Sequence, residues 1–180
     1  MNSTTWIAST VAVPVATYYA TTFVQVVFHR WFGHTDRLPA VYEQHLHGHH
    51  GDYRLDRLTS DKWIEAERHV MWYYALPLVP LSAVAAWLMP WPLFVLHVVA
   101  LGMTIWWHLY LHQQYHLNGT RWGHFAWFRR KRELHLRHHV RHHGNYAIVE
   151  FFWDRLLGTY DHAPLPPPRR ARPVFTREQS

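Results

Sequence analysis

The sequence predicts an all-α integral membrane protein with about three transmembrane helices, or four, and a helical cap in the cytosol. Residues 1–29 contain no Asp, Glu, Lys or Arg, and neither do residues 69–120, so every charge lies in the other segments. A soluble domain does not segregate its charges in this way. The net charge of +6 therefore does not indicate nucleic-acid binding, and we expect no nucleic-acid partner.

Three apolar stretches have the length of membrane crossings. The first, 6–28, is about 35 Å long as a helix and exceeds a hydrocarbon core of about 30 Å. The second uncharged block holds two crossings, 70–88 and 91–111, and Pro90 and Pro92 break the helix between them. The sequence thus predicts three crossings.

The basic residues predict the orientation. All 18 Lys and Arg fall in residues 29–69 or after residue 112, and none precedes the first crossing. By the positive-inside rule these segments are cytosolic and the N-terminus is outside. We divide the chain into a first transmembrane helix, 1–28, a main domain, 29–160, and a Pro/Arg-rich tail, 161–180, that we expect to be disordered.

Ten of the 18 histidines fall in four spaced groups at the cytosolic side of the crossings. They are His29 and His34, then His45, His49 and His50, then His108 and His112, and finally His135, His138 and His139. Ten imidazoles are too many for one four-coordinate zinc, and they suit two metals with about five nitrogens each. The absence of cysteine excludes thiolate ligands.

Helical spacing predicts which histidines act together. Residues four apart lie about 40° apart around an α-helix, so His108 and His112 share a face, as do the histidines of 135–139. His29 and His34 are five apart and diverge by about 140°, which predicts that they serve two different metals.

Other histidines are expected to play lesser parts. His142 and His143 continue the last group and are candidates for outer partners of the ligands. Mid-membrane His97 is either functional or a packing residue. We expect the remaining ones at the surface or as outer partners: His69, His116, His124 and His162.

The C-terminal part of the pattern resembles a known family. Residues 135–146, with their paired histidines and Asn145-Tyr146, lead to Trp153-Asp154 and then Gly158-Thr159. This ending is similar to the C-terminal signature of the fatty acid hydroxylase superfamily, which includes sterol desaturases and lipid hydroxylases. The resemblance covers His29 to about Thr159. It implies a membrane-bound, O2-dependent di-iron oxidoreductase that hydroxylates a fatty acid or sterol type of lipid in lipid biosynthesis.

The resemblance also implies roles for residues. The ten grouped histidines would bind two iron ions, which zinc can replace in purified protein, and Asp154 would orient an imidazole. The second group departs from the family's H-x-x-HH, because Leu46 stands at the expected first histidine. We prefer His45 as the substitute, because it shares a helix face with His49, and keep His47 as the alternative. The residues expected to support the ligands from outside are Asp154, Asn145, His142, His143 and His47.

Substrate and electrons must both reach such a site. We expect the lipid chain to lie along one face of the third crossing, on Leu101, Ile105 and Leu109. The sequence has no Cys for an iron–sulfur cluster and no dinucleotide fingerprint, so we expect a separate donor, a ferredoxin or cytochrome b5-like protein. The arginine-rich stretch 129–141 is expected either to dock this donor or only to anchor the cap to anionic lipid.

Two rival functions stay open from the sequence. A desaturase or carotenoid hydroxylase would use the same metal site. A non-catalytic membrane metal or haem carrier is the rival of another class, although a bis-His haem needs two histidines within the bilayer.

Overall fold

The computed structural model describes residues 2–64 and 71–164, and within these ranges the chain is helical, apart from turns and one isolated bridge between Ser60 and Leu117. The α-helices are α1 Ser3–Phe28, α2 Pro39–Tyr42, α3 His50–Asp52, α4 Leu78–Leu88, α5 Trp91–His116, α6 Ala126–Arg141 and α7 Phe152–Leu156. The π-helices are η1 His29–Gly33 and η2 Glu43–His49, and the 3₁₀ helices are η3 Met71–Tyr74 and η4 Arg121–His124. The predicted all-α class is confirmed.

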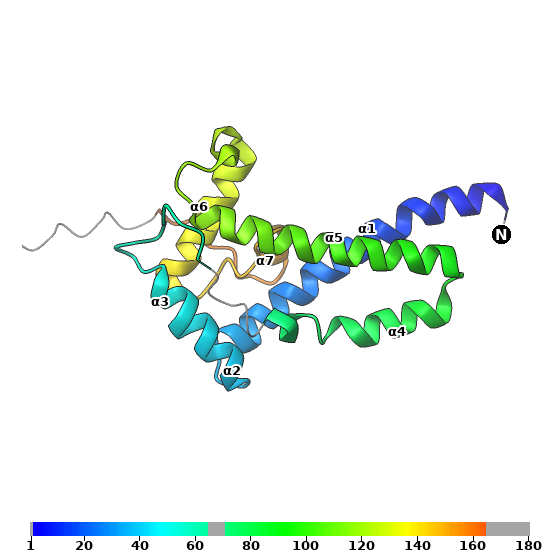
Figure 1. Ribbon diagram of the computed structural model, residues 1–180, viewed down its shortest axis with the longest axis horizontal. Coiled ribbons are helices and arrows are strands. Elements are labelled where there is room, and N and C mark those ends of the chain that lie inside the picture. Colours follow the sequence, from blue (N-terminus) through cyan, green and yellow to red (C-terminus); the bar gives the residue numbers. More distant parts are fainter. Residues whose placement is uncertain (1, 65–70, 165–180) are drawn as a thin grey trace, which may run out of the picture.

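Two long helices form the rod of the molecule. α1 and α5 pack along each other, α2, α3 and α6 gather at one end of the rod, which we call the cap, and α7 lies against α1 next to the cap (Figure 1). Both helices expose large apolar side chains, such as Ile7 at 68% and Met103 at 64%. Together with η1, α1 is long and apolar enough to cross a membrane, and so is α5. Apolar surface on this scale belongs against lipid.

The second predicted crossing, 70–88, is not one continuous helix in the part of the chain that the structure describes. α4 has 11 residues, about 16 Å, which is shorter than the hydrocarbon core. It runs alongside α5, to which it is joined by the turn at Pro90, and η3, which precedes α4 in the chain, lies nearer the cap (Figure 1). Three crossings and their orientation therefore stay predictions.

His97 joins three helices inside the rod. Its Nδ1 lies 2.8 Å from Thr17 Oγ1 of α1, and its Nε2 lies 3.1 Å from Ser82 Oγ of α4. Both ring nitrogens are thus engaged, and His97 is 3% exposed. This favours the packing role over an axial haem ligand.

The segment after α6 is packed into the cap rather than looping over it. Ala147, Ile148 and Val149 are buried, and Tyr115 of α5 donates its hydroxyl to the Ile148 carbonyl at 2.9 Å. Phe128 of α6 packs in the same cluster. α5, α6 and this segment therefore form one core that fixes the cap to the rod.

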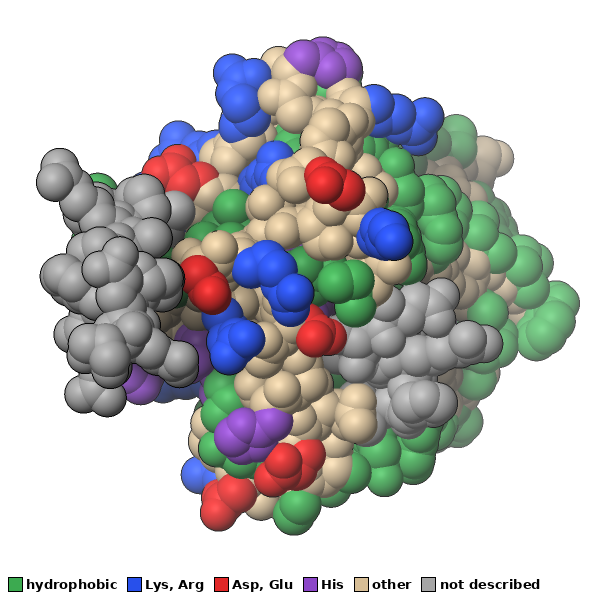
Figure 2. Space-filling view, turned by 60° about the vertical axis from the view of Figure 1, so that its left-hand side comes forward, with side chains coloured by type: hydrophobic (Ala, Val, Ile, Leu, Met, Phe, Trp, Pro, Cys, Tyr) green, Lys and Arg blue, Asp and Glu red, His purple; other side chains and the backbone are tan. Residues whose placement is uncertain are grey.

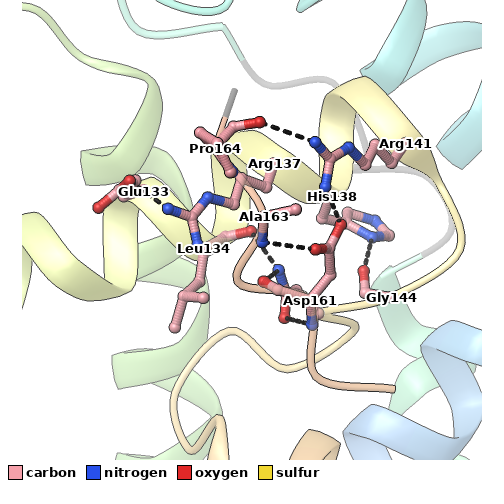
Figure 3. Close-up of polar contacts among 10 residues, drawn as sticks. Glu133, Leu134, Arg137, His138, Arg141, Gly144, Asp161, Ala163 and Pro164 are labelled. Carbon is pink, nitrogen blue, oxygen red and sulfur yellow. Dashed lines mark hydrogen bonds and ion pairs between the residues drawn. The ribbon is translucent and has the colours of Figure 1, made fainter. Parts of the chain in front are cut away.

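The basic residues of α6 mostly bind the chain itself. Arg132 donates to two backbone carbonyls at the end of α5, and Arg141 pairs with Asp161 at 2.6 Å (Figure 3). Arg137 pairs with Glu133 and is only 9% exposed, so it cannot form part of a docking surface. Figure 2 shows Lys, Arg, Asp and Glu interspersed on the cap, whereas apolar side chains cover the rod beside it.

Asp161 belongs to the predicted tail, yet it is held in place. Besides its pair with Arg141, its backbone N–H donates to Asn145 Oδ1 at 2.9 Å. The ordered chain thus extends past residue 160, and the rest of the tail, from residue 165, lies outside the described residues.

Candidate metal centre

Ten imidazoles converge in two groups of five inside the cap. In each group the five nitrogens that could bind a metal lie within 4.8 Å of one another. Nine of the ten side chains are buried and His34 is partly exposed. We call the groups cluster A, made of His29, His34, His45, His50 and His138, and cluster B, made of His49, His112, His116, His135 and His139.

The spacing of the nitrogens fits a metal. In cluster A, Nε2 of His45 lies 2.8 Å from Nε2 of His29 and 3.1 Å from Nε2 of both His34 and His50. Two imidazole nitrogens bound at a right angle to one metal, with bonds near 2.1 Å, are about 3.0 Å apart. In cluster B, Nε2 of His139 is buried and has no hydrogen-bond partner within the described ranges. Such an orphaned lone pair is suited to a cation.

Backbone carbonyls hold several rings by their other nitrogen. Nδ1 of His29 lies 2.5 Å from the Tyr146 carbonyl and Nδ1 of His138 lies 2.8 Å from that of Gly144 (Figure 3 shows the latter). Because a carbonyl only accepts, each Nδ1 must carry the proton, which leaves Nε2 free to bind metal. Two cluster B rings are held in the same way, His116 by Leu58 and His139 by Tyr53.

Burial keeps the histidines of the two clusters neutral. It lowers the pKa of His135, His138 and His139 well below the ordinary value, and neighbouring imidazoles lower it further. The pKa of His34 falls to about 2 for the same reasons, with His29 as the largest neighbour. All these rings therefore offer lone pairs at neutral pH.

The two π-helices explain the pairing within cluster A. His29 and His34 are five residues apart across η1, and His45 and His50 are five apart across η2. In a π-helix the backbone bonds run from i to i+5, which places residues five apart on one side. The prediction that His29 and His34 serve different metals does not match this geometry, since both lie in cluster A.

Two pairs of histidines that are adjacent in the sequence are divided between the two clusters. His50 and His138 belong to cluster A, whereas their neighbours His49 and His139 belong to cluster B. The rings of His50 and His139 stack with centroids 4.0 Å apart, so the clusters lie directly beside each other. The structure thus brings His45 to His50 in cluster A, and not to His49 as the shared α-helical face had indicated.

The third histidine group is one turn further along than predicted. His116, expected at the surface or as an outer partner, is 1% exposed and lies in cluster B with His112, four residues before it. His108 belongs to neither cluster, so its assignment as a ligand does not match the geometry. The H-x3-H spacing from His112 to His116 was the available signal, but the predicted crossing ended at residue 111 whereas α5 continues to His116.

Asp154 acts on the backbone and touches no imidazole in the part of the chain that the structure describes. Its carboxylate accepts the N–H groups of Tyr146 and Ala147, at 2.8 and 3.0 Å, and the hydroxyl of Thr159 at 2.7 Å. The Tyr146 carbonyl in turn holds His29. Asp154 thus acts on His29 only indirectly, through the backbone of Tyr146.

Of the other residues expected to support the ligands, some are buried near the clusters and others are exposed at the surface. Asn145 is fully buried and ties the Asp161 carbonyl to α6. His142 lies near cluster A, with its ring centroid 4.6 Å from that of His50. His47 is exposed beside Glu43 and lies in neither cluster of the described residues, which does not match the supporting role expected of it. His143, His124 and His162 are also exposed, and His69 lies outside the described residues.

A cavity connects the rod with both clusters. It has a volume of about 40 Å³ and is lined by His29 and His45 of cluster A and by His112 of cluster B. Of the residues expected to line a lipid slot, Ile105 and Leu109 border this cavity and Leu101 does not. A second cavity, of about 470 Å³, meets cluster A at His34 and is bordered by Arg30, Arg37, His142 and His143.

Comparison with known proteins agrees with this site. The model of the fatty acid hydroxylase family matches residues 14–159, which include the second half of α1 and every histidine of both clusters. Neither the curated proteins nor the solved structures contain a match to the chain. The match covers most of the 180 residues, and the chain therefore belongs to the fatty acid hydroxylase family.

Proposed function

We propose that the protein is a membrane-bound, O2-dependent oxidoreductase that uses two iron ions to hydroxylate an aliphatic lipid. The observation that carries this proposal is the pair of five-imidazole clusters that share one cavity between membrane helices. When bound, two irons would supply the oxidation of an unactivated C–H bond, which amino acid side chains cannot perform. The family match supports the same reaction class.

The chain's own residues would bind and orient the metals. Clusters A and B would hold one ion each, and the ten imidazoles, without a carboxylate, suit iron and also zinc. The carbonyls of Tyr146 and Gly144 fix the rings of His29 and His138 and raise their basicity. The buried position of the clusters excludes bulk water from the reacting centre.

The cavity would position the lipid. Ile105 and Leu109 of α5 provide an apolar wall beside three cluster histidines. An alkyl chain that enters from the bilayer would lie on this wall with one carbon close to both clusters. A desaturase or a carotenoid hydroxylase would need the same arrangement, and the oxidised product distinguishes them from a hydroxylase.

We further propose that electrons come from a separate ferredoxin or cytochrome b5-like protein that docks on the cap. In the predicted docking stretch, Arg129, Arg132 and Arg141 bind carbonyls or a carboxylate of the chain itself. Arg130 is exposed and is the better candidate for contact with an acidic donor. Sustained turnover of purified protein without any added donor would contradict this proposal.

The function is tested by comparing lipids from a host that expresses the wild-type chain with lipids from hosts that express His138→Ala or His124→Ala. His138 lies in cluster A, while His124 is exposed and in neither cluster, so it serves as the matched control. We expect a hydroxylated lipid with wild type and His124→Ala that is absent with His138→Ala. The same product in all three hosts would contradict the proposal.

Elemental analysis and an optical spectrum of the purified protein complete the test. Close to two metals per chain is expected, with iron or substituted zinc, because the two clusters are separate and complete. One metal or fewer in active protein would contradict the dinuclear site. A Soret band would favour the haem carrier.

A further inference from the structure

The shared cavity is lined by two polar side chains that belong to neither cluster. The cavity is bordered by apolar Ile105 and Leu109, yet Gln25 and His108 also line it. Gln25 is 5% exposed, and its Oε1 has no hydrogen-bond partner in residues 2–64 and 71–164. An unpaired buried amide oxygen is costly, so this atom marks the place of a hydrogen-bond donor from outside the chain.

Both polar residues lie at the same depth relative to the clusters. Gln25 precedes His29 by four residues on α1, and His108 precedes His112 by four residues on α5. Each is thus one helical turn, about 6 Å, further into the rod than a cluster histidine. Because α1 and α5 pack along each other, the two side chains reach the cavity from neighbouring helices.

The chemistry of this cavity selects a neutral group. No Asp, Glu, Lys or Arg of the described chain lines the cavity, so a bound carboxylate or ammonium would lie there without a countercharge. A hydroxyl can donate to Gln25 Oε1, which has no partner in the described chain, and accept from a ring N–H of His108, which lines the same cavity.

We propose that Gln25 and His108 form a hydroxyl-binding site, and that the lipid substrate carries a hydroxyl group about one helical turn from the carbon that is oxidised. This inference rests on the proposed function, because it takes the cavity as the substrate site. It gives His108 a role in substrate recognition in place of metal binding. Gln25 and His108 then determine which aliphatic lipids are accepted.

The test measures binding of probe lipids to the purified, metal-loaded protein in detergent. Radiolabelled hexadecanol is displaced by unlabelled hexadecanol, by its methyl ether, which cannot donate a hydrogen bond, or by hexadecane. We expect wild type to bind the alcohol about fivefold more tightly than the ether, as one buried hydrogen bond provides. In Gln25→Leu and in His108→Leu this preference should disappear.

Thr21→Val is the matched control. Thr21 lies one turn before Gln25 on α1 and its Oγ1 is also buried without a partner in the described chain, but it does not line the cavity. The preference for the alcohol should persist in this variant. Equal binding of alcohol and ether by wild type, or loss of the preference in Thr21→Val, would overturn the proposal.

Metal content separates the hydroxyl site from a ligand role. His108→Leu should retain as much metal as wild type, and loss of metal in this variant would overturn the assignment of His108. Wild-type protein that oxidises lipid while binding alcohol and ether alike would refute the hydroxyl site alone. Protein that prefers the alcohol but forms no oxidised lipid would refute the proposed function and support the site.

Discussion

The position and orientation of each imidazole ring decide which histidines belong to the metal centre. His108 and His116 lie on the same helix, one turn to either side of His112, and only His116 brings a nitrogen into cluster B. Its ring is fixed by the Leu58 carbonyl at 2.9 Å and stacks on Tyr53 with centroids 3.8 Å apart. Ring orientation, and not spacing alone, thus selects the ligand.

His116→Ala should lower the metal content from two towards one per chain, because cluster B would lose one of five imidazoles while cluster A stays intact. Elemental analysis of protein purified in parallel with His47→Ala measures the effect. His47 is exposed and outside both clusters, so that variant should match wild type. Full metal content in His116→Ala would show that cluster B does not need this ring.

Gly144 is required by a close approach of two backbone segments. A Cβ atom at this position would lie 2.5 Å from the Thr159 carbonyl oxygen, and the Gly144 carbonyl holds His138. Gly144→Ala should therefore destabilise the cap by about 1–3 kcal/mol and reduce binding in cluster A. Thermal unfolding and metal content test this against Gly123→Ala, where an added Cβ meets open space. Equal stability of both variants would contradict the prediction.

The π-helical turns are the elements that assemble cluster A. Both of its pairs of histidines five apart are aligned by η1 or η2, and Gly33 in η1 lets the rings of His29 and His45 approach, since a Cβ there would lie 3.1 Å from each. π-helical turns occur mostly at functional sites because they carry one residue more than an α-turn.

Deleting Trp31 should disrupt cluster A, because it shortens the spacing from His29 to His34 and removes the residue that makes η1 a π-helix. The expected result is loss of one metal and of lipid oxidation. Trp31→Ala keeps the spacing and, because Trp31 is 48% exposed, should retain both metals. If the deletion variant bound two metals, spacing in η1 would not matter for the site.

The sequence predicted the helical class and nine of the ten clustered histidines, but not how they are grouped. Apolar blocks and i, i+4 spacing follow from regular α-helices, and they were sufficient where the chain is regular, as in α6. The inserted residue of a π-turn leaves no mark in the sequence, so the pairs of cluster A were misassigned. His116 was missed because hydrophobicity ends at Leu111 although α5 continues.

Some parts of the site have no sequence signal at all. The carbonyl groups that hold His29, His116, His138 and His139 come from the backbone, which every residue possesses. Only the folded chain shows which carbonyl meets which ring. Asp154 was found by resemblance, but its contact with the 146–147 backbone depends on the same fold.

The molecule as a whole joins an apolar rod to a cap that encloses the neutral imidazoles of both clusters. Burial lowers the pKa of His45, His49, His135, His138 and His139 well below 6.5, with neighbouring imidazoles as a further cause. Because these side chains lie on several segments, their protonation is linked to the folding of the entire cap.

Stability should fall steeply with acidification. Below about pH 6.5 the unfolded chain takes up protons on its histidines, whereas the folded chain does not. Each such histidine lowers the free energy of unfolding by about 1.4 kcal/mol per pH unit of acidification. Loss of bound metal lowers it further, because imidazolium cannot bind metal. Unfolding midpoints between pH 7.5 and 5 test this, with and without a chelator. A flat profile in the metal-free protein would contradict the lowered pKa values.

The reach of cluster A along the chain also constrains how a cell makes the protein. Its ligands run from His29 to His138, and cluster B is completed only by His135 and His139 of α6. When the ribosome has translated the chain up to α6, both long helices of the rod, α1 and α5, have been made, but neither cluster has all its imidazoles. A metal ion that needs all five imidazoles of either cluster can therefore be fully bound only after α6 has been made.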